Sequence, residues 1–335
     1  MPNAAIYGCA GLALSDGEKQ FFRAADPWGF ILFARNADTP AQLSALCAQL
    51  RESVGRNAPI LIDQEGGRVA RLKPPHWRAH PPAGHYGALF AHDKAAGLEA
   101  CRLGAFLIGY ELQAHGIDVN CVPLADVPLP GSHAIIGDRA YGVDPDQVIA
   151  LARAAATGLE EAGVVPVLKH IPGHGRASVD SHDTLPVVDA DLDSLRAVEF
   201  KPFTALSDLP LGMTAHVVFT ALDPQHPATT SAAVIEVIRN EIGFDGLLMT
   251  DDLSMKALGG PVAQRVAESL AAGCDLILHC NGDMGEMDAV AAHAPALTAA
   301  AHLRSESALS RRKSPPDTPV EDAVHRWTEL LAADA

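Results

Sequence analysis

Five side chains that could perform acid–base or charge-based chemistry lie within residues 169–182. They are Lys169, His170, His174, Asp180 and His182. An apolar, β-branched run at 164–168 precedes them, and all five lie in the turn-rich sequence KHIPGHGRASVDSH. An apolar strand that ends in charged residues is typical of the carboxyl ends of parallel α/β sheets, where the next loop carries the chemistry. A single histidine here would most simply be a solvated loop residue, but this density of polar groups favours a functional site.

The three histidines suggest two kinds of chemistry. A shared metal is the less favoured one, because His170 and His174 are spaced along a Pro/Gly loop that cannot present both rings on one helix face. Asp180 precedes His182 by two positions. A carboxylate there can bind the imidazole and hold its tautomer, as in a catalytic dyad. The pair therefore favours acid–base chemistry.

Two adjacent carboxylates, Asp251 and Asp252, end another apolar run in GLLMTDDLSM. Either one could simply cap a helix that follows the strand. We favour the cap interpretation for Asp252. For Asp251, which is nearer the strand end, a catalytic carboxylate is the preferred interpretation.

Further polar groups fit the recognition of a sugar. Asp63 stands in LIDQEGGRVARL, upstream of Arg71, and the glycine spacing there matches no nucleotide-binding pattern. A carboxylate that accepts two hydroxyl hydrogen bonds beside an arginine suits a sugar. Arg139 in IIGDRAYG is a long donor from another loop, although a surface ion pair with Asp138 is the alternative for it.

The elements that would position these groups alternate along the chain. Eight short apolar runs occur at 5–11, 30–33, 59–62, 119–124, 164–168, 211–213, 247–249 and 275–278. Helix-like segments lie between most of them, at 39–54, 94–115, 145–162, 191–207, 231–242 and 261–272. Polar residues follow almost every run, which is where a barrel gathers its active site. The pattern predicts an α/β fold, a (β/α)8 TIM-type barrel in a single domain.

Composition limits the possible partners and the cellular location. The 335 residues include 25 basic and 41 acidic ones, and the formal net charge of -16 disfavours nucleic acids and anionic membranes as partners. Six scattered cysteines without a C-x-x-C pair indicate reduced thiols. The amino-terminal residues lack the features of a signal peptide. We expect a cytoplasmic monomer with one domain over residues 1–335 and a helical tail from about residue 285, whose last amphipathic stretch packs on the barrel.

Several segments closely resemble the motifs of glycoside hydrolase family 3. They are KHIPGHG with DSH and LP after it, IDQEGGRV, IGDRAYG, MTAHVVF and MTDDLSM. The resemblance runs in order from about residue 29 to residue 281. It is closest to the single-domain bacterial β-N-acetylglucosaminidases (β-hexosaminidases) of peptidoglycan recycling.

The resemblance implies a retaining exo-glycosidase on a (β/α)8 barrel, located in the cytoplasm of Gram-negative bacteria. The implied reaction removes the non-reducing N-acetylglucosamine from GlcNAc-1,6-anhydroMurNAc and its muropeptides through a covalent glycosyl-enzyme. It requires no metal or cofactor. Asp251 corresponds to the nucleophile, and His182, oriented by Asp180, to the acid/base. The sugar-binding positions correspond to Asp63, Arg71, Arg139, Lys169 and His170.

Other functions stay open on the sequence. A family relative could be a β-glucosidase or an N-acetylglucosamine phosphorylase, and selection for a 2-acetamido group rests on the resemblance alone. A sugar-binding protein without catalysis and a metal hydrolase are alternatives from other classes. Gly173 and Gly175 are expected to act as hinges that make His182 mobile without ligand.

Overall fold

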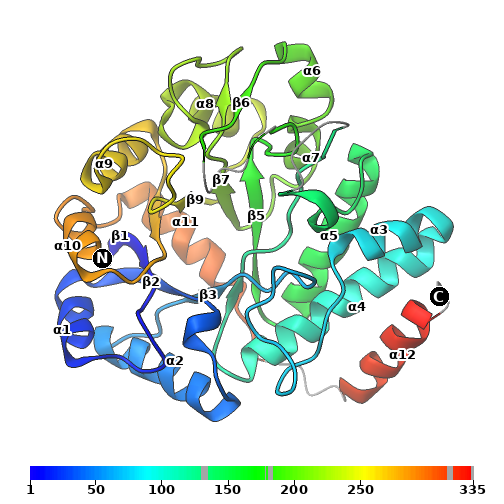
Figure 1. Cartoon of the computed structure of the whole chain (residues 1–335), viewed down its shortest axis with the longest axis horizontal. Coiled ribbons are helices and arrows are strands. Elements are labelled where there is room, and N and C mark those ends of the chain that lie inside the picture. Colours follow the sequence, from blue (N-terminus) through cyan, green and yellow to red (C-terminus); the bar gives the residue numbers. More distant parts are fainter. Residues whose placement is uncertain (130–134, 178, 180–183, 315–319, 333–335) are drawn as a thin grey trace.

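A closed barrel of eight parallel strands forms the centre of the molecule (Figure 1). A computed structural model describes residues 1–129, 135–177, 179, 184–314 and 320–332. The strands are β1 (Asn3–Tyr7), β2 (Pro27–Leu32), β3 (Ile60–Ile62), β4 (Val119–Asn120), β5 (Val165–Ile171), β7 (Leu211–Thr214), β9 (Leu247–Asp252) and β10 (Leu276–His279). They pair in the order β1-β10-β9-β7-β5-β4-β3-β2. Each overlaps one of the eight predicted apolar runs, so the predicted (β/α)8 barrel is confirmed.

The strands are largely apolar up to their carboxyl ends because both of their faces are buried. In β9, Leu247 and Met249 belong to the cluster inside the barrel, whereas Leu248 packs in the outer cluster beneath the helices. In β10, Leu278 faces inward and Ile277 outward in the same way. This alternation with a period of two residues leaves no solvated face, which explains continuous apolar runs rather than alternating ones. The barrel interior is a packed core, and the polar groups collect beyond it.

Most predicted helices form where the sequence places them. They include α2 (Pro40–Val54), α4 (Lys94–Gln113), α5 (Pro145–Glu161) and α9 (Val262–Ala272). Thr39 caps α2, since its side chain accepts the Gln42 N–H. The segment 231–242 is α8 (Ala232–Glu236) followed by a π-helical turn, Val237–Glu241.

The expected helix at 191–207 is divided into α6 (Leu192–Ala197) and α7 (Phe200–Ala205). Pro202 lacks the N–H that would bond to the carbonyl of Val198, so one continuous helix cannot run through it. Two further helices, α1 (Asp16–Ala25) and α3 (Ala83–His92), were not predicted. The start of α1 was readable, because Ser15 and Glu18 form a capping box.

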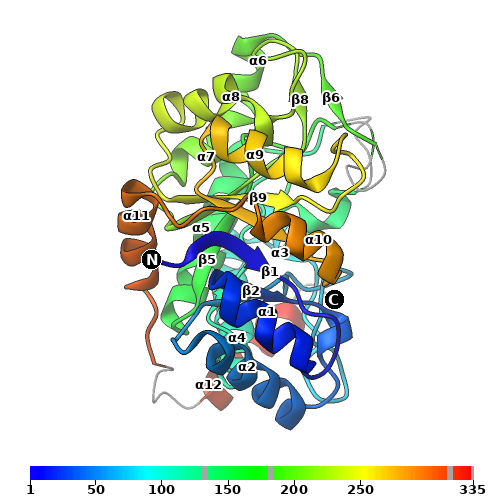
Figure 2. The ribbon, with the colours of Figure 1, turned by 90° about the vertical axis from the view of Figure 1, so that its left-hand side faces the viewer.

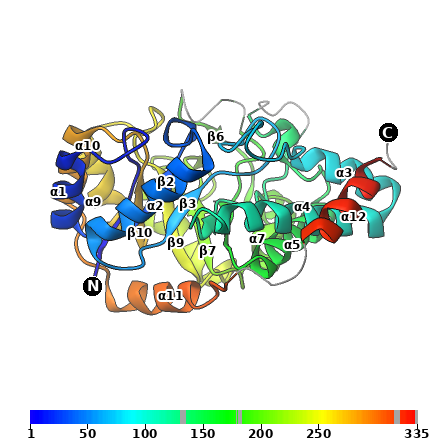
Figure 3. The same ribbon diagram turned by 90° about the horizontal axis from the view of Figure 1, so that it is seen from below.

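The ends of the barrel are covered differently. The tail contains α10 (Met284–Ala291), α11 (Ala299–Leu309) and α12 (Val320–Ala332). Helix α11 closes the amino-terminal end of the barrel, where Ala301 and Ala308 join the inner core (Figure 2). At the opposite end lies a small sheet of β6 (Val187–Val188) and β8 (Val218–Phe219). The expected docking of the last helix is confirmed, because α12 packs on α4 (Figure 3) and its Trp327 is buried.

No helix in the described part of the chain combines the length and the apolar character that a membrane crossing requires.

Candidate active site

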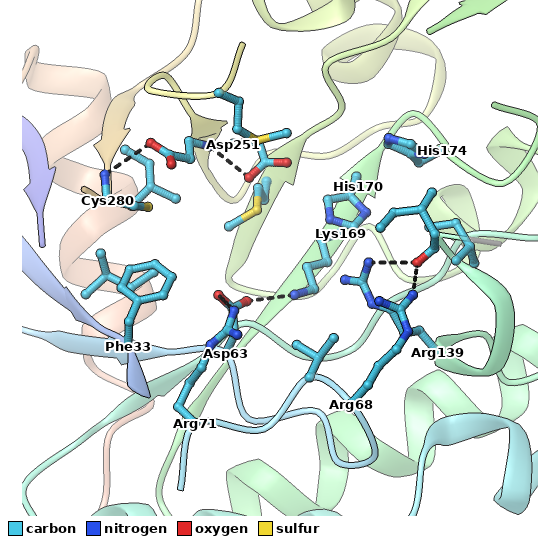
Figure 4. A pocket seen from close by; sticks show the side chains of 18 residues that line it. Phe33, Asp63, Arg68, Arg71, Arg139, Lys169, His170, His174, Asp251 and Cys280 are labelled. Carbon is cyan, nitrogen blue, oxygen red and sulfur yellow. Dashed lines mark hydrogen bonds and ion pairs between the residues drawn. The ribbon is translucent and has the colours of Figure 1, made fainter. Parts of the chain in front are cut away.

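A pocket of about 290 Å3 opens at the carboxyl ends of the barrel strands (Figure 4). It is lined by Ile31, Phe33, Asp63, Arg68, Val69, Arg71, Ile135, Ile136, Arg139, Lys169, His170, His174, Met213, Asp251, Asp252, Met255, Leu278 and Cys280. The fold therefore brings together six of the eight residues proposed from the sequence: Asp63, Arg71, Arg139, Lys169, His170 and Asp251. The other two, Asp180 and His182, lie outside the described residues.

A charge network around the buried Lys169 forms one wall of the pocket. Lys169 Nζ lies 2.9 Å from Asp63 Oδ1 and 2.7 Å from Glu65 Oε1. Arg71 approaches the other oxygen of Asp63 at 3.3 Å. Arg139 donates to both oxygens of Glu65, at 2.7 and 2.8 Å. Asp63 and Glu65 are two positions apart beyond β3, so both can point to the same side and share Lys169.

The network keeps its members charged. Burial raises the pKa of Asp63, but Lys169, Arg71 and Arg139 outweigh it and hold that pKa far below its usual value. The pKa of Glu65 falls to about 2 because Lys169 and Arg139 likewise outweigh burial. For Lys169, burial lowers the pKa, but the two carboxylates raise it above its usual value. At neutral pH the pocket wall is thus a fixed array of charged donors and acceptors, which suits sugar hydroxyls.

Glu65 is the main residue of this network to which the sequence interpretation assigned no role. The alternative interpretation of Arg139, a surface ion pair with Asp138, is wrong, because Arg139 pairs with Glu65, and Asp138 lies 3.5 Å from Arg68. The readable signal was the D-x-E spacing, which predicts that Glu65 lies on the same side as Asp63.

Arg71 is held in place by its own loop. The Gln64 side-chain oxygen accepts the backbone N–H groups of Arg71 and Leu72 at 2.7 and 3.1 Å. The Arg71 guanidinium lies 5.2 Å from the centre of the Phe33 ring. The loop turns tightly at the glycine pair Gly66–Gly67, since Gly66 has φ +100° and a Cβ there would collide with the Pro81 carbonyl oxygen.

Asp251 stands at the end of β9, across the pocket from the charge network (Figure 4). Its Oδ1 accepts the N–H of Asp252 at 2.8 Å. Burial raises the pKa of Asp251, but His216, His170, this N–H and Lys169 together lower it below the usual value. The carboxylate is therefore ionised at neutral pH, as a nucleophile or an electrostatic stabiliser must be.

Asp252 has a structural role of a different kind from the one predicted. Its carboxylate accepts the Ser254 N–H at 2.9 Å, the Ser254 hydroxyl at 2.6 Å and the Cys280 N–H at 3.1 Å. The next helix, α9, begins only at Val262. Asp252 thus closes a turn and ties it to the end of β10, and the prediction of a helix cap is wrong.

The histidines of the β5 strand end lie close together. The ring centroids of His170 and His174 are 5.6 Å apart, and His170 Nδ1 binds Asp126. Burial, and next the neighbouring His170, lower the pKa of His174 to about 4. In the described part of the chain, no three His, Cys, Asp or Glu side chains are placed to share a metal ion.

Gly173 and Gly175 do not have the surroundings of hinges. A Cβ on Gly175 would collide with the Val127 carbonyl, and one on Gly173, at φ +142°, would lie 3.0 Å from Glu199 Cβ. Arg176 then donates to both carboxylate oxygens of Glu199 at 2.9 and 3.1 Å. The first turn of this loop is thus packed in place, and both glycines are required for close approach of the backbone. The hinge role of these two residues stays a prediction.

Comparisons with known proteins agree with this geometry. Residues 18–309 match the N-terminal domain of glycosyl hydrolase family 3. The chain is 38% identical over 280 residues to a beta-hexosaminidase of Methylococcus capsulatus, with 82% of each chain covered. It is 35% identical over 284 residues to a beta-hexosaminidase of Bordetella avium, covering 84% of this chain and 81% of that one.

Solved structures show the same architecture. NagZ from Neisseria gonorrhoeae, solved in complex with N-trifluoroacetyl-D-glucosamine, matches with a TM-score of 0.89 and 28% identity, over 100% of this chain and 98% of that one. A family 3 beta-N-acetylglucosaminidase from Paenibacillus matches with a TM-score of 0.79 and 33% identity, over 99% of this chain and 62% of that one. Because the family match covers the strands from β2 to β10 and the pocket between them, the chain belongs to glycosyl hydrolase family 3.

Proposed function

We propose that this glycoside hydrolase is a retaining exo-β-N-acetylglucosaminidase. Its substrate would be GlcNAc-1,6-anhydroMurNAc and the corresponding muropeptides of peptidoglycan recycling. The observation that carries the proposal is one pocket in which an ionised, half-buried Asp251 faces the charge network of Asp63, Glu65 and Lys169. Support for the sugar comes from relatives named beta-hexosaminidase and from the N-trifluoroacetyl-D-glucosamine bound to the Neisseria protein.

The shape of the pocket favours attack at a chain end. Its floor is made of Ile31, Met213 and Leu278, and all three residues also belong to the core inside the barrel. A sugar that enters from the mouth cannot continue through this floor. The terminal residue of a glycan would therefore occupy the pocket, and the rest of the substrate would lie toward the mouth, which is exo-action.

The chemistry needs a nucleophile and a group that changes its protonation twice. Asp251 would attack the anomeric carbon and form a glycosyl-enzyme ester while the bond to the leaving oxygen breaks. His182, oriented by Asp180, would give its proton to that oxygen. In the second step the same imidazole would take a proton from water, which displaces Asp251 and restores the β configuration.

The six cysteines are free thiols in the fold, and all of them are buried. We therefore also propose that the enzyme works in the reducing cytoplasm, which this pattern supports.

Hydrolysis assays with chelator and without phosphate separate the candidate activities. We expect 4-nitrophenyl N-acetyl-β-D-glucosaminide to be cleaved roughly 100-fold more efficiently than the matching β-glucoside, because a site that binds the acetamide loses that contact with a hydroxyl. Chromatography should show the release of N-acetylglucosamine from GlcNAc-1,6-anhydroMurNAc. Equal rates on both aryl glycosides would point to a β-glucosidase. Turnover only with phosphate would identify a phosphorylase, and no turnover a binding protein.

The acid role of His182 is tested by the leaving group. His182→Ala should slow substrates with poor leaving groups, such as a disaccharide, far more than nitrophenyl glycosides, because an acidic phenol departs without proton assistance. Comparing kcat/KM of the variant and the wild type on both substrates measures this. Equal losses on both would count against the acid role.

A further inference from the structure

Asp126 is a buried carboxylate beneath the pocket to which the proposed chemistry assigns no part. We propose that Asp126 is a positioning residue that fixes the tautomer and the orientation of His170, so that His170 presents Nε2 to the sugar. The inference about catalysis rests on the proposed function, whereas the inference about the tautomer does not.

The geometry places Asp126 between two parts of the site. Asp126 follows β4 and has no exposed surface. Its Oδ2 lies 2.7 Å from His170 Nδ1, and its Oδ1 accepts the His174 N–H at 2.6 Å and the His170 N–H at 3.4 Å. One carboxylate therefore holds the ring that ends β5 and the first turn of the loop that follows.

The same geometry determines which edge of the ring faces the sugar. His170 is 6% exposed and lines the pocket, whereas Asp126 does not line it. Nδ1 and Nε2 lie on different edges of an imidazole. Since the Nδ1 edge of His170 faces Asp126, which lies outside the pocket lining, we infer that the Nε2 edge faces the pocket.

The chemistry of the pair assigns the proton. Burial raises the pKa of Asp126, but its contacts with His170 and His174 lower it below the usual value, so the group is a carboxylate at neutral pH. A carboxylate only accepts hydrogen bonds, so Nδ1 of His170 must carry a proton. An acceptor that holds a functional histidine in this way commonly sets both its tautomer and its orientation.

The substitution Asp126→Asn reverses the polarity of this contact with little change of shape. The amide oxygen must stay at the Oδ1 position, because the NH2 group placed there would face the N–H of His174. The NH2 group then faces His170 Nδ1, which has to accept instead of donating. In the neutral imidazole the proton consequently moves to Nε2, so this nitrogen, which accepts a hydrogen bond from a sugar in the wild type, donates one in the variant.

Nitrogen NMR of the imidazole tests this without any substrate. In the wild type, 15N shifts assigned by comparison with His170→Ala should show a protonated Nδ1 at neutral pH. In Asp126→Asn they should show a bare Nδ1 and a protonated Nε2. A bare Nδ1 in the wild type would overturn the proposal even if the variant failed to fold, and an unchanged Nδ1 proton in the folded variant would do so too.

Kinetics test whether the effect passes through His170. Asp126→Asn should lower kcat/KM on the N-acetylglucosaminide roughly 10- to 100-fold. In a His170→Ala background the same change should cost less than about twofold, because its target is gone. If Asp126→Asn lowered kcat/KM in the His170→Ala background by the same factor as in the wild type, Asp126 would act elsewhere, and the proposal would be overturned. If the wild type hydrolysed no hexosaminide, the proposed function would fail, while the NMR result would still decide the tautomer.

The matched control is Asp118, at the other end of β4. Its carboxylate is also buried, but it accepts the Ile60 N–H at 2.8 Å and pairs with Arg51 and Arg312, away from the pocket. Asp118→Asn should lower the stability of the fold yet leave kcat/KM within about twofold of the wild type. A loss as large as that of Asp126→Asn would show that neutralising any buried carboxylate of this strand impairs turnover, which would contradict a specific role of Asp126.

Discussion

Replacing Asp251 with alanine should lower kcat on 4-nitrophenyl N-acetyl-β-D-glucosaminide by roughly 10⁴- to 10⁶-fold, as expected for loss of a nucleophile. Binding of N-acetylglucosamine should stay close to that of the wild type, because Asp63, Arg71 and Lys169 bind one another and not Asp251. Stopped assays measure the turnover, and calorimetric titration measures the affinity for the sugar.

The neighbouring carboxylate provides the contrast for this experiment. Asp252→Asn removes the same charge one position later, but the carboxylate that it replaces binds Ser254 and the Cys280 N–H. We expect a lower unfolding temperature and a much smaller loss of turnover than with Asp251→Ala. Near-wild-type turnover by Asp251→Ala, or equal loss in both variants, would contradict the nucleophile assignment.

Lys169→Met should destabilise the fold by about 3–5 kcal/mol, the usual cost of breaking a buried ion pair by removing one partner. Lys169 is 2% exposed and is the cation shared by Asp63 and Glu65. The affinity for N-acetylglucosamine should fall as well, since the wall of the pocket loses a donor. Chemical unfolding followed by circular dichroism gives the free energy of unfolding of both proteins.

The pH range of this effect follows from the shifted pKa values. The pKa of Glu65 is lowered from 4.5 to about 2, so its contribution to stability is complete above pH 4.5 and is lost as the pH falls toward 2. The pKa of Lys169 is raised above 10.5, so its contribution is complete below that pH. The stability difference between Lys169→Met and the wild type should therefore be constant from about pH 5 to pH 10.

Lys201→Met is the matched control for Lys169→Met. Lys201 Nζ lies 2.7 Å from Asp146, but the lysine side chain is 43% exposed and the aspartate 70%. Such surface pairs contribute about 0–1 kcal/mol. A loss of stability at Lys201 equal to that at Lys169 would show that the burial of the network does not matter.

The barrel was predictable because each of its strands can be recognised from a few consecutive residues. A parallel strand that is buried on both faces must be a short apolar run, and eight such runs alternate with helical segments along the sequence. The division of 191–207 could have been foreseen from Pro202, and α1 from its capping box. The two-residue strands of the β6–β8 sheet could not, because so few residues carry no periodic pattern.

Only those residues of the candidate site that lie in recognisable sequence motifs were predictable. Polar residues at the ends of the apolar runs that form β3, β5 and β9 predicted the site positions of Asp63, Lys169, His170 and Asp251. Ion-pair partners depend on the tertiary fold instead: Arg139 binds Glu65, 74 positions away, and not its neighbour Asp138. The role of Asp126 was hidden for the same reason, since its partners His170 and His174 lie 44 and 48 positions further along the chain.

The most direct test of a retaining mechanism at Asp251 is to trap the covalent intermediate. The wild-type protein would be mixed with a slow N-acetylglucosaminyl donor, such as a 5-fluoro glycosyl fluoride, quenched and digested for mass spectrometry. We predict that the peptide containing Asp251 gains one glycosyl unit, and that the same peptide from Asp251→Ala gains none. A label on another residue, or continued turnover of the donor without any labelled peptide, would contradict the mechanism.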